Sequence, residues 1–343
     1  MEGASQAARS RRECVALRHI SLVRCAMSGA FACPCMVRDV VRGLHFPTDP
    51  IRKAAVVGSP LPSRLISPFF VLIWSTGFVV ARYGLPYAEP LTFLSMRFAG
   101  VLAVLAPFSV GAGIAWPGWR QGIHMAVAGV LLQAGYLGGV WIAIHLGMGA
   151  GLAALVVGLQ PLLTAVAGRW MGEPPSARQW AGLVLGFVGV ALVVGNRIGM
   201  LGLTWQALAF AVAALLSITA GTLYQRRFCP RVDLRAGLLL QFGASLVVVL
   251  PAAWLFETMA VQWTWALAGA WAWSVFALSI GAICLLFLLI RRGAATRVAS
   301  LMYLTPAVTA LMAWAAFDEP LTATMVAGMA LSAFAVAWAQ GKR

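Results

Sequence analysis

The chain has 343 residues, of which 61% are hydrophobic and 10% are charged, and its mean hydropathy is +0.87. Soluble domains carry about 25% charged residues, so this composition excludes a soluble globular domain and predicts an all-α integral membrane protein. The net charge of +15 is spread over short basic runs between apolar stretches. Because these runs form no continuous basic face, we expect no nucleic-acid partner.

Residues 1–64 differ from the rest of the chain, with ten basic and four acidic residues and no long apolar run. We expect a basic, disordered cytoplasmic tail. Its most apolar stretch, 25–36, is short and contains Pro34, which argues against a cleaved signal peptide. Met27 and Met36 are alternative start residues, so the sequence leaves open whether the tail belongs to the mature protein. The cysteines lack the spacing of a zinc site, so we expect no metal, no cofactor and no disulfide framework.

From residue 65 onward, the chain divides into ten apolar stretches joined by short connections. Each is close to the roughly 20 residues that a helix needs to cross a bilayer. We therefore predict ten transmembrane helices, separated by breaks rich in Gly, Pro and charged residues. The predicted spans are 65–82, 90–110, 122–145, 150–171, 179–195, 203–224, 235–256, 264–290, 294–316 and 322–340.

The two halves of this region repeat each other, because landmark residues return 144 to 146 positions later. The matching pairs are Arg97 and Gln241, Pro107 and Pro251, Pro161 and Pro306, and Glu173 and Glu319. We assign 65–196 to a first repeat and 201–341 to a second. Internal repeats within a membrane are typical of secondary transporters.

Lys and Arg are concentrated in loops on the cytoplasmic side of membrane proteins. With the tail inside, only Arg82 and Arg197 fall outside, so we predict that both termini are cytoplasmic. Five helices per repeat is an odd number, so the second repeat enters the membrane from the opposite side. Two inverted repeats predict a site near the bilayer midplane that opens to each side in turn.

Several motifs resemble the EamA-type permeases of the drug/metabolite transporter superfamily, and the resemblance extends over about residues 65 to 340. It implies the ten-helix fold and the export or exchange of small metabolites, often amino acids or related compounds, across a bacterial inner membrane. The similar segments are 72–78, 84–93 leading to Arg97, 149–155, Gln160-Pro161, Gly172-Glu173 and 180–182.

Two other functions stay open, a broad-specificity drug or toxic-compound efflux carrier and a membrane scaffold or sensor that transports nothing. We do not expect an enzyme, because the sequence has no nucleophile elbow, no HExxH helix and no paired aspartates within a span.

Arg97 is the main candidate site residue, because an ionisable side chain inside a span costs about 3 kcal/mol on insertion scales. It lies about 10 Å below the outer end of its predicted span. It either holds a substrate carboxylate through its bidentate guanidinium or stabilises the bundle by pairing with carbonyls or polar side chains. All six acidic residues beyond the tail lie at span ends or in loops, which favours exchange or facilitated diffusion over a carboxylate proton relay. His145, near a span end, is the remaining candidate for proton coupling.

Other polar or aromatic side chains within the spans either line a substrate cavity or form hydrogen bonds between helices. Pro161 and Pro306 predict paired helix bends, beside the substrate path or as packing kinks. Small-residue faces on the fifth and tenth spans predict close packing, in a monomeric bundle or a homodimer. The candidate substrate-binding residues, besides Arg97, are Trp74, Ser75, Gln133, Tyr136, Gln160, Gln241, Tyr303 and Thr305.

Overall fold

The computed structural model describes residues 63–110, 114–171, 176–197, 203–229, 233–283, 285 and 304–340. They belong to one compact unit, 55–343. Some predicted features lie outside the described residues: nearly all of the tail, Tyr303, Glu173 and parts of the predicted spans 264–290 and 294–316.

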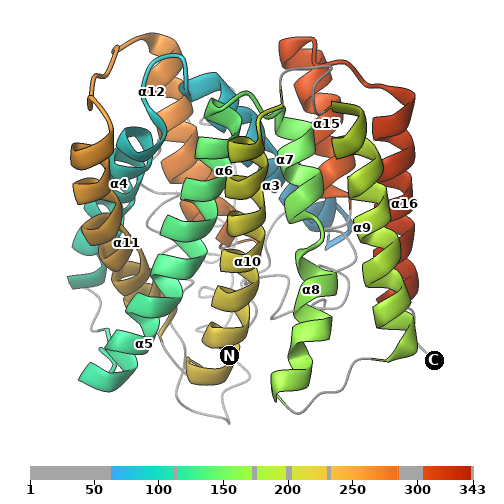
Figure 1. Cartoon of the computed structure of the whole chain (residues 1–343). Coiled ribbons are helices and arrows are strands. Elements are labelled where there is room, and N and C mark those ends of the chain that lie inside the picture. The colour runs from blue at the N-terminus through green and yellow to red at the C-terminus, as the bar shows by residue number, and fades with distance from the viewer. Residues whose placement is uncertain are drawn as a thin grey trace, which may run out of the picture. The chain divides into compact units, whose positions relative to one another are not determined.

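The described chain is helical and has an isolated β-bridge between Ala88 and Val261. Figure 1 shows the helices packed side by side with their ends at two opposite faces. They are α3 (Ser63–Gly84), α4 (Pro90–Val110), α5 (Trp119–Gly129), the π-helix η1 (Val130–Gly135), α6 (Tyr136–His145), α7 (Ala150–Val157), α8 (Gln160–Ala167), the 3₁₀ turn η2 (Gly168–Met171), α9 (Ala177–Arg197), α10 (Trp205–Phe228), α11 (Leu234–Phe256), α12 (Trp265–Ala272), the π-helix η3 (Trp273–Gly281), α15 (Thr305–Phe317) and α16 (Ala323–Gln340).

Within the described ranges, six helical segments are long and apolar enough to cross a membrane, and four further apolar helices are shorter. A helix satisfies its own backbone polar groups, which a hydrocarbon environment requires. The six are Pro90–Pro107, Trp119–His145, Ala150–Ala167, Ala177–Val194, Trp205–Phe228 and Leu234–Phe256, and the four are Pro68–Gly84, Trp265–Gly281, Thr305–Phe317 and Ala323–Ala335.

The outer surface of the bundle is apolar and ends in aromatic side chains. Trp265 is 95% exposed, and Trp119, near the opposite end, is 72% exposed. Aromatic residues of this kind are enriched at both membrane–water interfaces. Exposed aromatic residues near helix ends include Trp116 and Trp119 at the start of α5, Trp205 at the start of α10, Trp254 and Phe256 at the end of α11, and Trp263 and Trp265 at the start of α12.

Polar side chains cap the starts of several helices. Thr204 accepts a hydrogen bond from Ala207 N at the start of α10, and Thr264 accepts one from Leu267 N at the start of α12. Asp233 accepts one from Arg235 N at the start of α11. These oxygens satisfy backbone donors that have no partner within their own helix.

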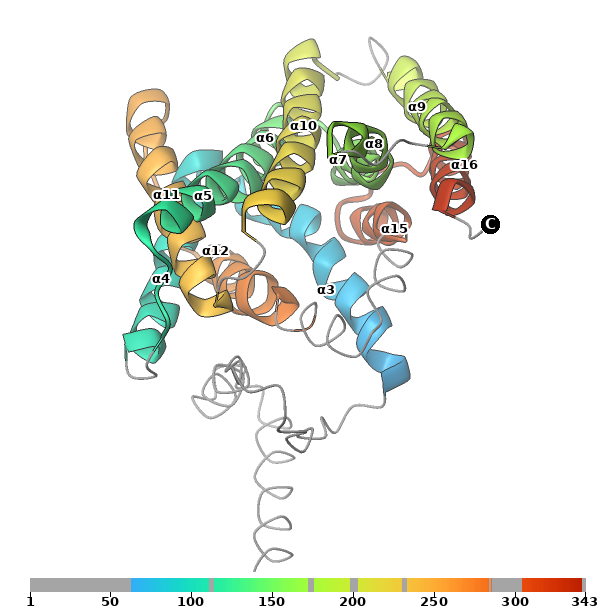
Figure 2. The ribbon, with the colours of Figure 1, turned by 90° about the horizontal axis from the view of Figure 1, so that it is seen from below.

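Helices from the two predicted repeats pack directly on each other. α4 lies against α11 at one edge of the bundle, and α9 lies against α16 at the other (Figures 1 and 2). Phe98 and Phe242, which the predicted repeat places at matching positions, are buried with their ring centroids 5.6 Å apart. On the other edge, Ser332 Oγ donates to the carbonyl oxygen of Gly186, 3.4 Å away.

Small residues allow the closest helix contacts, and Gly129 at the end of α5 is the clearest case. A Cβ at this position would lie 2.6 Å from the carbonyl oxygen of Gln241 in α11. No side chain fits there, because the obstacle is backbone that cannot rotate away. Gly122, on the same helix, has open space around the position of a Cβ.

We expect Gly129→Ala to destabilise the fold by about 1–3 kcal/mol, because α5 and α11 must separate to admit the methyl group. Gly122→Ala is the matched control, and we expect it to be neutral or to stabilise α5 by up to about 1 kcal/mol through helix propensity. Thermal unfolding of both variants in the same detergent measures the difference. Equal unfolding temperatures would contradict the close contact between Gly129 and Gln241.

Candidate functional site

Arg97 lies in α4 with 6% of its surface exposed, in the interior of the bundle. Its Nε donates to the hydroxyl oxygen of Ser279 in η3, 3.0 Å away. Ser279 Oγ in turn donates to the carbonyl oxygen of Ser274, at 2.9 Å. Among the described residues, no carboxylate forms an ion pair with Arg97.

The π-helix η3 brings these groups together. A π-helix widens the helical turn and leaves backbone carbonyls displaced from regular α-helical pairing, and such turns occur often at functional sites. η3 packs against both α3 and α4. On the α3 side, Trp273 Nε1 donates to Thr76 Oγ1 at 2.9 Å. η3 therefore links the polar residues of α3 to Arg97.

Tyr136, the first residue of α6, is the titratable side chain that interacts electrostatically with Arg97 in the described structure. It is buried, with 8% of its surface exposed. The structure thus brings together two of the predicted site residues, Arg97 and Tyr136, from α4 and α6. Both groups are hydrogen-bond donors, so together they favour an anionic or strongly accepting ligand.

Ser75 and Thr305 belong to a second group, between α3 and α15. Thr309 Oγ1 donates to the carbonyl oxygen of Ser75 at 3.3 Å, and Thr305 lies one helical turn before Thr309. The hydroxyls of Ser75, Ser274 and Thr305 are buried and have no hydrogen-bond partner among the described residues. A buried hydroxyl without a partner costs about 1–3 kcal/mol, so a ligand that satisfies these groups gains binding energy.

The remaining predicted residues lie in separate contacts. Gln160 Nε2 donates to Thr222 Oγ1 in α10 at 3.3 Å, and Gln241 Nε2 donates to Gln225 Oε1, also in α10, at 3.3 Å. Trp74 packs against the ring of Phe70, and Gln133 is half-buried within η1. The contacts of Gln160 and Gln241 join helices to each other and do not reach Arg97.

Pro161 and Pro306 occupy the second positions of α8 and α15. α7 ends at Val157 and α8 begins at Gln160, so the helical segment is interrupted directly before Pro161. A Cβ on Gly158 in this interruption would lie 2.9 Å from Pro306 Cγ. The interruption that precedes Pro161 therefore lies against Pro306 at the start of α15.

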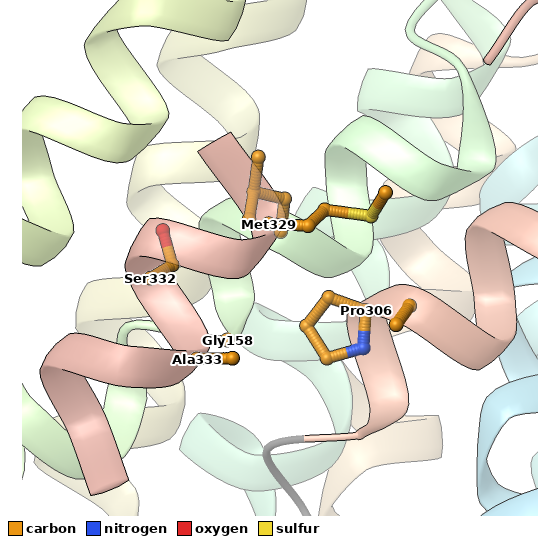
Figure 3. A pocket seen from close by; sticks show the side chains of 7 residues that line it. Gly158, Pro306, Met329, Ser332 and Ala333 are labelled. Atoms are coloured by element: carbon orange, nitrogen blue, oxygen red, sulfur yellow. The ribbon is translucent and has the colours of Figure 1, made fainter. Parts of the chain in front are cut away.

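A small hollow of about 20 Å³ lies beside this contact. Figure 3 shows Pro306 on one side of it and Met329, Ser332 and Ala333 of α16 on the other. Arg97 is not among its lining residues. The lining is Leu155, Gly158, Pro306, Ala307, Met329, Ser332 and Ala333.

Carboxylates tie the helices together at the upper end in Figure 1. Glu319, which follows α15 and is 7% exposed, forms an ion pair of 2.7 Å with Arg82 at the end of α3. It also accepts a hydrogen bond from Ala150 N, at 3.1 Å, and so caps the start of α7. A Cβ on Gly149 would lie 2.7 Å from Glu319 Oε2, so a side chain at this position would displace the Glu319 carboxylate.

A second carboxylate closes the neighbouring part of the same end. Glu257 accepts hydrogen bonds of 2.7 Å from Leu91 N and from the backbone and hydroxyl of Thr92, which caps the start of α4. Glu89 accepts two from Thr258, at 2.7 and 2.6 Å. Each contact joins residues more than 160 positions apart, so the two halves of the chain are held together at this end.

Sequence reasoning missed Ser279, Ser274 and the pair of Arg82 with Glu319 as parts of the candidate site. Ser279 lies 182 positions from Arg97, and no spacing rule connects residues at that separation. Glu319 did carry a signal, since it stands at a matching position of the two repeats, but that signal does not name its partner.

The chain matches the model of the EamA-like transporter family in two stretches, residues 68–195 and 205–339. It is 28% identical over 282 residues to "Uncharacterized transporter YvbV" of Bacillus subtilis, a match that covers 78% of this chain and 88% of the relative. It is 27% identical over 267 residues to "Uncharacterized inner membrane transporter YedA" of Escherichia coli, covering 77% and 86%.

A "Probable amino-acid metabolite efflux pump" of Escherichia coli is 26% identical over 187 residues, covering 53% of this chain and 59% of the relative. A solved crystal structure aligns with this chain at a TM-score of 0.58 and 22% identity. The alignment covers 80% of this chain and 95% of the solved chain, and it supports the fold alone. Two matched stretches that together span most of the chain establish the assignment. This chain belongs to the EamA-like transporter family and is a multi-pass membrane transporter.

Proposed function

We propose that this transporter exports or exchanges small carboxylate-bearing metabolites, such as amino acids or related compounds, across a bacterial inner membrane. The observation that carries the proposal is the buried guanidinium of Arg97, whose hydrogen-bond partner in the described structure is the neutral hydroxyl of Ser279. A buried charge without an opposite charge is costly, and a bound carboxylate removes that cost through charge-assisted hydrogen bonds.

One relative supports this substrate class. The Escherichia coli protein named as a probable amino-acid metabolite efflux pump matches about half of this chain. Amino-acid metabolites carry a carboxylate, which is the group that an isolated buried arginine binds best. The name describes the relative. It supports the proposal for this chain because a carboxylate substrate agrees with the positive charge of Arg97.

The transport mechanism we propose is alternating access by two inverted repeats of five spans each, 65–196 and 201–341. Two contacts and one match in sequence position support it. Phe98 touches its repeat counterpart Phe242, α9 packs on its counterpart α16, and an offset of 145 positions carries η1 to 275–280, within η3. Contact between matching elements is expected when a two-fold axis relates the two halves.

Charge supports an orientation with both termini in the cytoplasm. The upper end in Figure 1 carries Glu89, Glu257, Asp318 and Glu319, whereas Arg residues dominate the opposite end. Cytoplasmic ends are enriched in Lys and Arg, so we assign the upper end to the outside. The arginines of the lower end are Arg120, Arg169, Arg178, Arg226, Arg227 and Arg235.

With this orientation, the contacts of Glu257 and Glu319 close the outside of the bundle. The ion pair between Glu319 and Arg82 joins α15 to α3, and the cap on Ala150 adds α7. Alternating access requires these contacts to break when the site opens outward. We therefore propose that Glu319 acts as an outer closure that is formed in this conformation.

We expect Arg97→Gln to reduce counterflow of carboxylate substrates in proteoliposomes by roughly 10- to 100-fold, the loss expected from one charge-assisted hydrogen bond or pair. Arg97→Lys should retain part of the flux, because it keeps the charge and loses the bidentate fork. The substrates come from a panel of amino acids, their derivatives and drugs. Thermal unfolding in detergent separates a folding defect from a binding defect.

Unchanged flux in well-folded Arg97→Gln would show that Arg97 only stabilises the bundle. Efflux restricted to drugs without a carboxylate would favour the broad-specificity efflux carrier. A protein that exchanges no member of the panel would be a scaffold or sensor.

We expect Glu319→Gln to increase outward exposure of the interior. A cysteine introduced as Ser75→Cys, in a background without other cysteines, reports that exposure through its labelling by a membrane-impermeant maleimide added outside. Loss of one ionic hydrogen bond shifts a two-state equilibrium by about tenfold, so the labelling rate should rise by about that factor. The matched control is Asp318→Asn, the exposed neighbouring acid, which should label at the parent rate. Equal rates in both variants would remove Glu319 from the closure.

A further inference from the structure

The charges in the interior of the bundle are unequal in sign. Arg97 is buried there, and the described acidic side chains lie at helix ends or in the adjoining connections. The contacts of these acids are Glu89 with Thr258, Glu257 with Leu91 and Thr92, Glu319 with Arg82 and Ala150, and Asp233 with Arg235, while Asp318 is exposed after α15. Beyond the tail, the sequence contains one more acid, Glu173, which falls in a predicted connection between spans.

This balance discriminates between ligands that share a carboxylate. A monoanion brings one negative charge to one positive charge and leaves the site neutral. A zwitterion also brings an ammonium group, which Arg97 repels and which no interior carboxylate of the described chain compensates. Two like charges at about 4 to 7 Å in a medium of low dielectric repel strongly, so the zwitterion binds less well.

The groups that face Arg97 do not change this balance. Ser279 offers a hydroxyl that is already committed to Ser274 O, and Tyr136 offers a phenolic hydroxyl. Both are neutral hydrogen-bonding groups. The site therefore keeps a single positive charge for its ligand.

The same charges determine the energetics of a transport cycle. The described histidines lie toward the helix ends, since His124 pairs with Tyr224 at 2.7 Å near the start of α5 and His145 ends α6. A cycle in which the carrier exports one monoanion and returns empty moves one negative charge outward. An inside-negative membrane potential drives this movement, and 100 mV corresponds to a concentration ratio of about 50-fold.

We propose that the site around Arg97 selects organic monoanions, carboxylates without an ammonium group, and that the membrane potential drives their export as an electrogenic uniport. The proposal rests on the proposed function, because it assumes that Arg97 binds the substrate carboxylate. It adds the charge class of the substrate and the source of the driving force.

The test uses the full chain in proteoliposomes with a potassium diffusion potential set by valinomycin. The probes are alanine, leucine and phenylalanine, each as the free amino acid, the N-acetyl acid and the amide, so that the side chain stays constant while the charge changes. We expect the N-acetyl acids to enter at least tenfold faster than the free amino acids. At an inside-positive potential of about 100 mV, they should accumulate up to about 50-fold, and without potential they should only equilibrate.

The outcomes separate this proposal from the proposed function. If no probe and no member of the wider panel is exchanged, the proposed function fails. If the free amino acids enter as fast as the N-acetyl acids, charge selection is wrong although transport is established. Accumulation that follows a proton or sodium gradient and ignores the potential would overturn the electrogenic uniport.

A pair of variants tests the charge balance at the site itself. Ser279→Asp places a carboxylate beside Arg97 Nε, so the preference for N-acetyl acids over free amino acids should fall at least tenfold. Ser279→Asn is its neutral counterpart and should keep that preference. An unchanged preference in a folded Ser279→Asp protein would contradict the proposal. If that variant does not fold, the flux ratios of the parent protein still decide it.

Discussion

The cost of placing a charge inside an apolar bundle is the constraint on which this structure depends. With 61% hydrophobic residues, the chain has little polar surface with which to surround an ion, so each charge must lie at a helix end or serve a purpose. The described acids lie at helix ends, where backbone N–H groups and arginines stabilise them. Arg97 is the exception among the described cations, because it is buried in the middle of a helix and its hydrogen-bond partner is a neutral hydroxyl. The proposed binding of an anion rests on that exception.

The same constraint explains how the helices are joined. A helix start leaves backbone donors without partners, and in five of the described helices a nearby side chain on the same chain segment accepts from them. In α4 and α7, the acceptor comes from a carboxylate more than 160 positions away, Glu257 or Glu319. Helix capping therefore also connects the two halves of the chain. A contact that caps a helix and joins the halves is well placed to respond when the halves move relative to each other.

Interruption of regular helix accompanies the polar groups. η3 supplies Ser274 and Ser279, η1 precedes Tyr136, and the gap between α7 and α8 precedes Gln160. Irregular backbone at membrane depth is tolerated where protein or a polar cavity satisfies it. The hollow beside Pro306 lies at such an interruption and apart from Arg97. In this conformation, the hollow, which is lined mostly by apolar residues, is thus separate from the polar groups around Arg97 and η3.

The sequence by itself determined the class of protein, the apolar segments and the buried position of Arg97, because these follow from local composition and from the cost of charge in hydrocarbon. It also predicted the breaks at Pro161 and Pro306, since proline lacks the donor that a helix needs. The tertiary structure alone decided which residues meet: Arg97 with Ser279, Glu319 with Arg82, and Phe98 with Phe242. These partners are separated by more than 140 positions, and a helix face carries no record in its own sequence of which other helix will cover it. Packing in three dimensions chooses that helix, and with it the neighbours of Arg97.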